Sequence, residues 1–163
     1  MKNTAPVVEN NDCYENDMAG IGNRDEAAPV IRRNKCYRNK MAGIGSDGSR
    51  PWIIGNECRE NLMAGIGLKG KATGMIQNNQ CLENKLVAIG ITQASTATIL
   101  NNQLKRTGGV PPILAVKDGS TAFIQGNTIQ GGGVAAVLVQ GTAVIRDNSF
   151  LGVGGKQGNA VWV

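Results

Sequence analysis

The sequence predicts an all-β solenoid, a parallel β-helix of about seven coils with three short strands in each coil. The first observation is an asparagine that recurs at intervals of 23, 22, 23, 23, 25 and 21 residues, at Asn11, Asn34, Asn56, Asn79, Asn102, Asn127 and Asn148. The second is an aliphatic β-branched residue three positions before each asparagine, and an apolar residue two positions after it. A repeat of this length is typical of solenoids, whose units bury apolar side chains by stacking on one another.

Each repeat is expected to hold three strands. The first carries the β-branched residue: Val8, Ile31, Ile53, Ile76, Ile99, Ile124 and Ile145. The second carries the apolar residue: Cys13, Cys36, Cys58, Cys81, Leu104, Ile129 and Phe150. The third is the motif Ala-Gly-Ile-Gly, as at 42–45. Alternation with a period of two favours strands, and Asn, Gly, Asp and Pro mark the turns between them. No segment shows helical spacing over ten residues.

The recurring asparagines are interpreted as structural. Stacked strands lie roughly 4.8 Å apart, so each amide can bond the amide in the next coil. Such an internal asparagine ladder satisfies buried polar groups without a ligand.

The segments Ala28–Asn34 and Ala143–Phe150, together with Ala-Gly-Ile-Gly, resemble the right-handed parallel β-helix repeats of the pectin-lyase-like superfamily. The likeness is greatest to carbohydrate-binding and sugar-hydrolase (CASH) domains, and it covers nearly the whole chain. It implies a right-handed helix and a single domain over residues 1–163. That superfamily includes lyases, hydrolases, epimerases and non-catalytic modules, so the resemblance leaves the activity open. We expect no end caps, because the chain starts and stops in mid-coil, at Val7–Val8 and Ala160–Val163.

The composition excludes several classes of function. The chain of 163 residues has a formal charge of +5 with acids and bases interspersed, so no nucleic-acid partner is expected. No apolar run is long enough for a membrane span, and the first residues lack a signal peptide. Histidine, the commonest general base and metal ligand, is absent. The compartment stays open, although free cysteines favour the cytoplasm.

The four cysteines fall in one column, one in each of the first four coils. A straight column cannot converge on a tetrahedral zinc ion, and parallel side chains disfavour the disulfide dihedral angle. We therefore expect buried, reduced thiols, and neither a metal nor a cofactor.

Charged columns alternate in sign through the first coils. Glu15, Arg38 and Glu60 form one such column, which indicates surface ladders that set the register of the coils. Glycoside hydrolysis needs two carboxylates facing each other across the scissile bond. Only Glu60 and Glu83 are adjacent acids in one column, so a catalytic carboxylate set is not evident.

The fifth coil is irregular and is the candidate region for catalysis. The segment 104–121 is longer than its counterparts and contains two successive prolines, and extra length in a solenoid goes into a loop on one face. The catalytic candidates there are Lys105, Arg106, Lys117 and Asp118. The candidate binding surface is Tyr14, Tyr37, Trp52 and Phe123, whose flat rings suit apolar sugar faces. For the two tyrosines, which share a column, a ring ladder between coils is the alternative.

Two columns of small residues flank the isoleucine of the third strand. One is Gly20, Gly43, Gly65 and Ala88, and the other is Gly22, Gly45, Gly67 and Gly90. Alternation predicts that both face outward. Strand glycines mark either the close approach of a ligand or the demands of tight turns, and the sequence leaves both interpretations open.

A further column, four residues before each recurring asparagine, is predicted to face outward although it is apolar. It consists of Val7, Val30, Trp52, Met75, Thr98, Phe123 and Val144, and is called the outer apolar column below. Such a stripe predicts a homo-oligomer, foremost a dimer. The favoured function is a non-catalytic module, a scaffold that binds polysaccharide or protein. The alternatives are a carbohydrate-active enzyme (a polysaccharide lyase, hydrolase or epimerase), a fragment of one, or an engineered or truncated piece.

Overall fold

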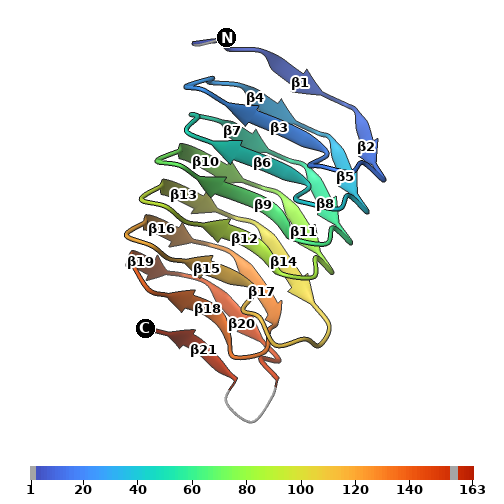
Figure 1. The fold of residues 1–163 in the computed structure, drawn as a ribbon. Helices are drawn as coiled ribbons and strands as arrows, with labels where there is room; N and C mark the ends of the chain where they lie inside the picture. The colour runs from blue at the N-terminus through green and yellow to red at the C-terminus, as the bar shows by residue number, and fades with distance from the viewer. Residues whose placement is uncertain (1–2, 155–157) are drawn as a thin grey trace.

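The computed structural model describes residues 3–154 and 158–163, and this part of the chain contains 21 β-strands and no helix. It therefore has no helix that could cross a membrane. The strands form three seven-stranded sheets in which every coil contributes one strand to each sheet (Figure 1). All strand pairs are parallel. The predicted parallel β-helix of about seven coils with three strands per coil is confirmed.

The strand bounds follow the repeat. The first sheet contains β1 (Val7–Glu9), β4 (Val30–Arg32), β7 (Trp52–Ile54), β10 (Thr73–Gln77), β13 (Thr96–Leu100), β16 (Thr121–Gln125) and β19 (Thr142–Arg146). The second contains β2 (Asp12–Tyr14), β5 (Lys35–Tyr37), β8 (Glu57–Arg59), β11 (Gln80–Leu82), β14 (Gln103–Arg106), β17 (Thr128–Gly131) and β20 (Ser149–Leu151). The third contains β3 (Ile21–Arg24), β6 (Ile44–Asp47), β9 (Ala64–Lys69), β12 (Val87–Ile91), β15 (Leu114–Val116), β18 (Ala135–Val139) and β21 (Asn159–Trp162).

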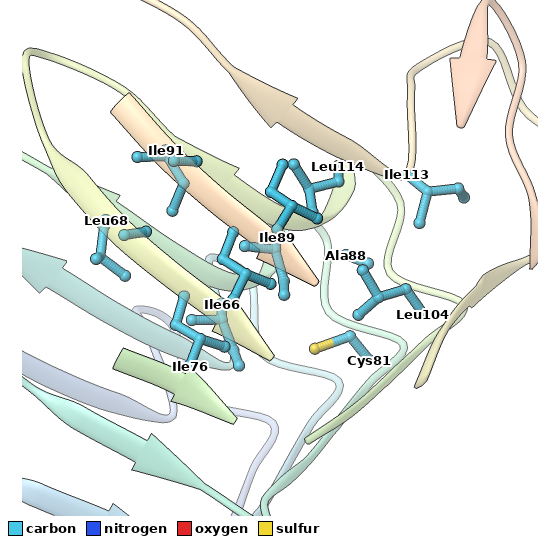
Figure 2. Close-up of a cluster of buried hydrophobic side chains, with 14 of the residues drawn as sticks. Ile66, Leu68, Ile76, Cys81, Ala88, Ile89, Ile91, Leu104, Ile113 and Leu114 are labelled. Atoms are coloured by element: carbon cyan, nitrogen blue, oxygen red, sulfur yellow. The ribbon is translucent and has the colours of Figure 1, made fainter. Parts of the chain in front are cut away.

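The three sheets enclose one continuous apolar core. Ile53 and Ile76 of the first sheet, Cys58 of the second, and Ile66 and Ile89 of the third are all fully buried. Figure 2 shows how side chains from successive coils meet there. Each coil adds one layer to the core, because side chains in register stack along the helix axis.

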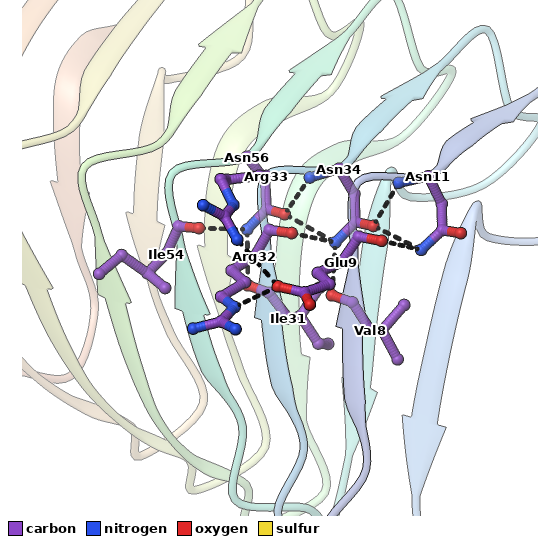
Figure 3. A network of polar contacts seen from close by, with 9 residues as sticks. All are labelled: Val8, Glu9, Asn11, Ile31, Arg32, Arg33, Asn34, Ile54 and Asn56. Carbon is purple, nitrogen blue, oxygen red and sulfur yellow. Dashed lines mark hydrogen bonds and ion pairs between the residues drawn. The ribbon is translucent and has the colours of Figure 1, made fainter.

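The predicted asparagine ladder runs through all seven coils at the corner between the first and second sheets. The Asn56 Oδ1 atom accepts hydrogen bonds from the Asn34 backbone N–H at 2.9 Å and from Asn34 Nδ2 at 3.0 Å. Asn56 Nδ2 in turn donates to the Ile31 carbonyl in the preceding coil at 2.8 Å (Figure 3). Every rung thus satisfies buried backbone groups as well as its own amide.

A second ladder, which the sequence analysis did not identify, occupies the corner between the second and third sheets. It consists of Asn16, Asn39, Asn61 and Asn84. Asn39 Nδ2 donates to Asn61 Oδ1 at 2.9 Å, and Asn61 Nδ2 donates to the Cys36 carbonyl at 3.0 Å. At both corners the residue before the asparagine has a positive φ, for example 56° at Arg33 and at Glu60. One left-handed residue therefore turns the chain at each of these corners.

The cysteine column lies as expected. Cys36, Cys58 and Cys81 are buried, Cys13 is partly buried, and all four are free thiols. A hydrogen bond with Cys58, reinforced by burial, raises the pKa of the Cys36 thiol far above its usual value. Such thiols stay protonated and unreactive.

The charged columns form ion pairs between neighbouring coils. Arg38 lies 2.8 Å from Glu60 and 3.8 Å from Glu15. Arg32 lies 2.6 Å from Glu9, as Figure 3 shows. These pairs agree with the predicted ladders. Arg106 stands four residues after Asn102, as Arg38 stands four residues after Asn34, yet Arg106 is only 6% exposed.

Candidate functional site

The outer face of the third sheet is hollowed by a groove of about 570 Å³ over β3, β6, β9 and β12. Its floor is Gly22, Gly45, Gly67 and Gly90, one residue from each coil. One wall is Met18, Met41, Met63 and Leu86, and the opposite wall is Arg24, Asp47, Lys69 and Thr92. The groove therefore runs along the helix axis, across the strands.

The floor glycines make the groove because they leave available space empty. A Cβ atom at Gly22 would have no neighbour within 4 Å, and at Gly45 or Gly67 its nearest contacts would be at an ordinary 3.6 or 3.8 Å. None of these glycines needs a left-handed backbone. A larger residue at Gly22, Gly45 or Gly67 would therefore fit the fold and fill the groove, whereas a Cβ atom at Gly90 would lie 3.1 Å from Val87 Cγ2. The predicted outward orientation of this glycine column is confirmed.

The other small-residue column does not face outward, so that prediction was wrong. Gly43 and Gly65 are buried, and a Cβ atom at Gly65 would lie 2.8 Å from Asn84 Nδ2 and 2.7 Å from the Ala88 carbonyl oxygen. Strand alternation fails here because the chain is still rounding the corner occupied by the second ladder. These glycines are required by the asparagine in the next coil.

Side chains close the groove after the fourth coil. Ala115 follows Gly90 in register, and Leu138 and then Trp162 follow Ala115. Ala115 packs against Val87, which is itself packed with Ala64. The exposed glycine floor is thus confined to the coils in which the Ala-Gly-Ile-Gly motif or its Val87-Ala-Ile-Gly variant occurs.

The groove is apolar between charged rims. The thioether wall is open to solvent, with Met18 66%, Met41 36% and Met63 40% exposed. On the rim, Lys69 lies 3.3 Å from Asp47. A second ion pair, Lys40 with Asp17 at 2.6 Å, is formed by the residues that precede Met41 and Met18 in the chain. Within residues 3–154 and 158–163, no group of three or more His, Cys, Asp and Glu side chains is arranged to hold a metal ion.

A second cavity, of about 650 Å³, lies beside the irregular fifth coil. It is lined by Lys105, by 107–110 and by the glycines at 131–133. Arg106 is used to build its wall: Nη1 donates to the Leu86 carbonyl at 2.8 Å, Nε donates to the Gly108 carbonyl at 3.0 Å, and Nη2 donates to the Pro111 carbonyl. Burial lowers the pKa of Arg106, yet a guanidinium stays charged.

The four catalytic candidates do not gather at one place. Lys105 and Arg106 end β14 in the second sheet and line the loop cavity. Lys117 and Asp118 follow β15 in the third sheet, and they do not line that cavity. The structure therefore brings the first pair together and leaves the second pair at another corner.

The four aromatic candidates lie on two different faces. Tyr14 and Tyr37 stack on the second sheet with ring centroids 5.0 Å apart, and the Arg59 guanidinium lies 4.2 Å from the centroid of Tyr37. Both faces of the Tyr37 ring are thus in use, so only Tyr14 keeps a free ring face. Trp52 and Phe123 point outward from β7 and β16 of the first sheet, with two strands between them.

The outer apolar column is in register along the first sheet and faces outward, as predicted. Val7, Trp52, Met75 and Val144 are 39–56% exposed. The groove on the third sheet, in contrast, was signalled in the sequence only by its glycine column.

Comparison with known proteins agrees with the geometry. Residues 1–151 match the family described as a right-handed β-helix region. The chain belongs to this right-handed β-helix family. No curated protein sequence matches it.

Solved structures with the same fold include three alginate epimerases. The periplasmic alginate epimerase AlgG superimposes with a TM-score of 0.77 at 16% identity, over 91% of this chain and 43% of its own. The A-modules of the Azotobacter vinelandii mannuronan C-5 epimerases AlgE6 and AlgE4 give TM-scores of 0.69 and 0.63 at 15% identity, over 96% of this chain and 56% and 55% of theirs. The β-helix described here spans about half the length of these structures.

Proposed function

We propose that this β-helix is a non-catalytic binding module and that the groove on the third sheet holds a stretch of polysaccharide chain. The observation that carries the proposal is the groove itself: an open channel of about 570 Å³ with a bare glycine floor, running across four coils. Concave, largely apolar sites with a few polar groups are the usual form of ligand sites in proteins.

The chemistry of the walls suits a sugar chain. Pyranose rings present apolar C–H faces, which can pack against the floor and against Met41 and Met63. Hydroxyl groups at the ring edge can bond to Arg24, Asp47 or Lys69 on the opposite wall. Thioether side chains adapt to irregular apolar surfaces, which suits a ligand with more than one conformation.

The periodicity of the groove also suits a polymer. The glycine floor and the apolar wall repeat with every coil, roughly every 4.8 Å, whereas the opposite wall changes its side chain from coil to coil. This spacing is close to the length that one sugar residue adds to an extended chain, so equivalent sugars can meet equivalent side chains. The names of the three structural neighbours, all alginate epimerases, also support a polysaccharide ligand.

The test is calorimetric titration with a panel of neutral and acidic oligosaccharides. Gly45→Val and Gly67→Val fill the floor, and the Cβ atom of each would lie at an ordinary contact distance, 3.6 or 3.8 Å, from its nearest neighbour. We expect each to weaken binding by roughly tenfold or more, equivalent to about 1.4 kcal/mol. Thr98→Val, a β-branched substitution on the outer face of the first sheet, is the matched control and should bind like the wild type. The proposal fails if the wild type binds no member of the panel, or if the floor variants bind as tightly as the wild type.

A second candidate function, a carbohydrate-active enzyme, is favoured by the same neighbours, which are enzymes. Its site would be the loop cavity beside Lys105, since Arg106 is committed to backbone carbonyls. Proton NMR of polysaccharides incubated with the protein tests this. New unsaturated ends, new reducing ends or inverted sugar stereocentres would establish catalysis and contradict the non-catalytic proposal.

A further inference from the structure

The outer face of the first sheet has the character of an interface. A sheet face in water is normally lined by polar side chains, yet Trp52 is 46%, Met75 39% and Val144 45% exposed here. Ile54 and Leu100 lie in the next outward column of the same face. An apolar patch of this extent marks an interaction site.

The order of residues along the outward columns of this face is complementary to the same order read from the opposite end of the helix. In the outer apolar column, Met75 is the fourth of seven residues, and a valine lies at each end. In the neighbouring outward column, Glu9 lies at one end, where it also pairs with Arg32 and Arg33 of its own chain, and Arg146 lies at the other end, over the ring of Phe123. Ile54 is third from the first end, and Leu100 is third from the second.

We propose that a second copy of this chain packs against this face with its helix axis antiparallel. The two copies are related by a two-fold axis that runs parallel to the strands and lies in the interface between the two β10 strands, the middle strands of the two sheets. Under this symmetry each residue meets the residue at the same distance from the opposite end of its column. Glu9 then faces Arg146 of the second copy, Ile54 faces Leu100, and Met75 faces itself. An isologous interface requires this kind of self-complementary pattern.

The size of the face fits a stable dimer. Seven strands spaced roughly 4.8 Å apart, with two outward positions on each three-residue strand and three on each five-residue strand, present about 600 Å² per copy. The total of about 1,200 Å² is at the lower end of the range for specific interfaces. The third sheet takes no part, so the dimer keeps two open grooves. This inference goes beyond the proposed function and does not depend on it.

Light scattering coupled to gel filtration tests the dimer. The wild type should have twice the mass of the chain. Met75→Lys places two like charges at the two-fold axis and should weaken dimerisation by at least tenfold. Met63→Lys, in the turn just before β9 and away from the first sheet, at a matching 40% exposure against 39%, should stay dimeric. A monomeric wild type, or a dimer that Met63→Lys disrupts and Met75→Lys does not, overturns the proposal.

Cross-linking tests the register. In a Cys13→Ser background, the remaining native thiols are buried. Facing sheets lie about 10 Å apart, so a short bismaleimide can join opposed cysteines. An equal mixture of Val7→Cys and Val144→Cys proteins should give a mixed cross-linked dimer, whereas neither protein alone should. Cross-linking of Val7→Cys to itself instead would indicate parallel helices and contradict the two-fold axis.

Discussion

The two corners of the helix that contain an asparagine ladder are built from the same two residues in each coil, but one ladder extends through more coils than the other. At each, a left-handed residue precedes an asparagine whose amide bonds to the next coil. The corner between the first and second sheets repeats in all seven coils, from Asn11 to Asn148. The corner between the second and third sheets keeps its asparagine only as far as Asn84.

The second ladder ends after the fourth coil because the side chain of Arg106, rather than an asparagine, bonds to the backbone in the fifth coil. In the fifth coil the strand continues through Arg106, whose long side chain donates to carbonyls 2, 5 and 20 residues away. An amide rung requires the next coil to follow the same path. A guanidinium reaches farther, so the chain can leave the path and form the loop that lines the second cavity. The asparagine ladder therefore holds successive coils to the same chain path, whereas Arg106 allows the fifth coil to leave that path.

The largest expected effect comes from removing that arginine. Arg106→Leu leaves three carbonyls without their donor and should lower the free energy of unfolding by about 4 kcal/mol. Urea unfolding followed by circular dichroism measures this. Lys105→Leu, on the exposed neighbour, is the control and should change stability little. If both variants unfold at the same urea concentration, Arg106 does not organise the loop.

A somewhat smaller loss is expected from breaking a ladder. Asn61→Ala in the second ladder and Asn56→Ala in the first should each cost about 3 kcal/mol, because each leaves buried partners in two coils unsatisfied. Asn16→Ala, at an exposed position, should cost less than about 1 kcal/mol. Equal losses at Asn16 and Asn61 would show that burial does not control the contribution of a rung.

Glycine-to-alanine substitutions in the two glycine columns should change the free energy of unfolding in opposite directions, by less than the loss of a ladder asparagine. Gly65→Ala should destabilise by about 2 kcal/mol because its Cβ would collide with the next coil. Gly67→Ala should stabilise slightly, since glycine weakens a strand interior. In a double-mutant cycle, Asn84→Ala should relieve part of the Gly65→Ala loss. Additive losses would mean that the asparagine does not impose the glycine. Ala88 already tolerates a side chain, because the ladder ends at Asn84.

The smallest effect concerns the exposed charges. Arg38→Glu places one more acid between Glu15 and Glu60 in the same column and should lower the unfolding midpoint modestly, and Glu15→Arg should recover part of the loss. The hydrogen bond from Arg38 lowers the pKa of Glu60 below its ordinary 4.5. The stability from this pair is therefore present above about pH 4.5 and declines as the pH falls through the lowered pKa. Unfolding at several pH values checks this, and unchanged acid sensitivity in Arg38→Glu would exclude the pair as its source.

The fold could be predicted from the sequence because the length of the repeat and its recurring apolar positions indicate a stacked solenoid. The inward Ile53 and Cys58 positions, the first ladder and the outward Trp52 all follow from stacking and alternation. Alternation could not predict Gly65, because a corner breaks the period of two. Nor could it predict the burial of Arg106, since that depends on carbonyls as far away as Leu86. The groove was only partly predictable: the column of Gly67 was evident, but the methionine wall lies in a turn without a strand pattern.

The modularity of the groove has an evolutionary consequence. The glycine floor, the apolar wall and both asparagine rungs recur together in the first four coils, so the in-frame duplication of one such repeat would add a complete section of channel, lengthening it by roughly 4.8 Å. Recombination between near-identical repeats can change the length of the site in whole steps, without the point mutations that would otherwise have to reshape it. The number of coils that carry a bare glycine floor would then reflect the length of the ligand to which the groove has adapted.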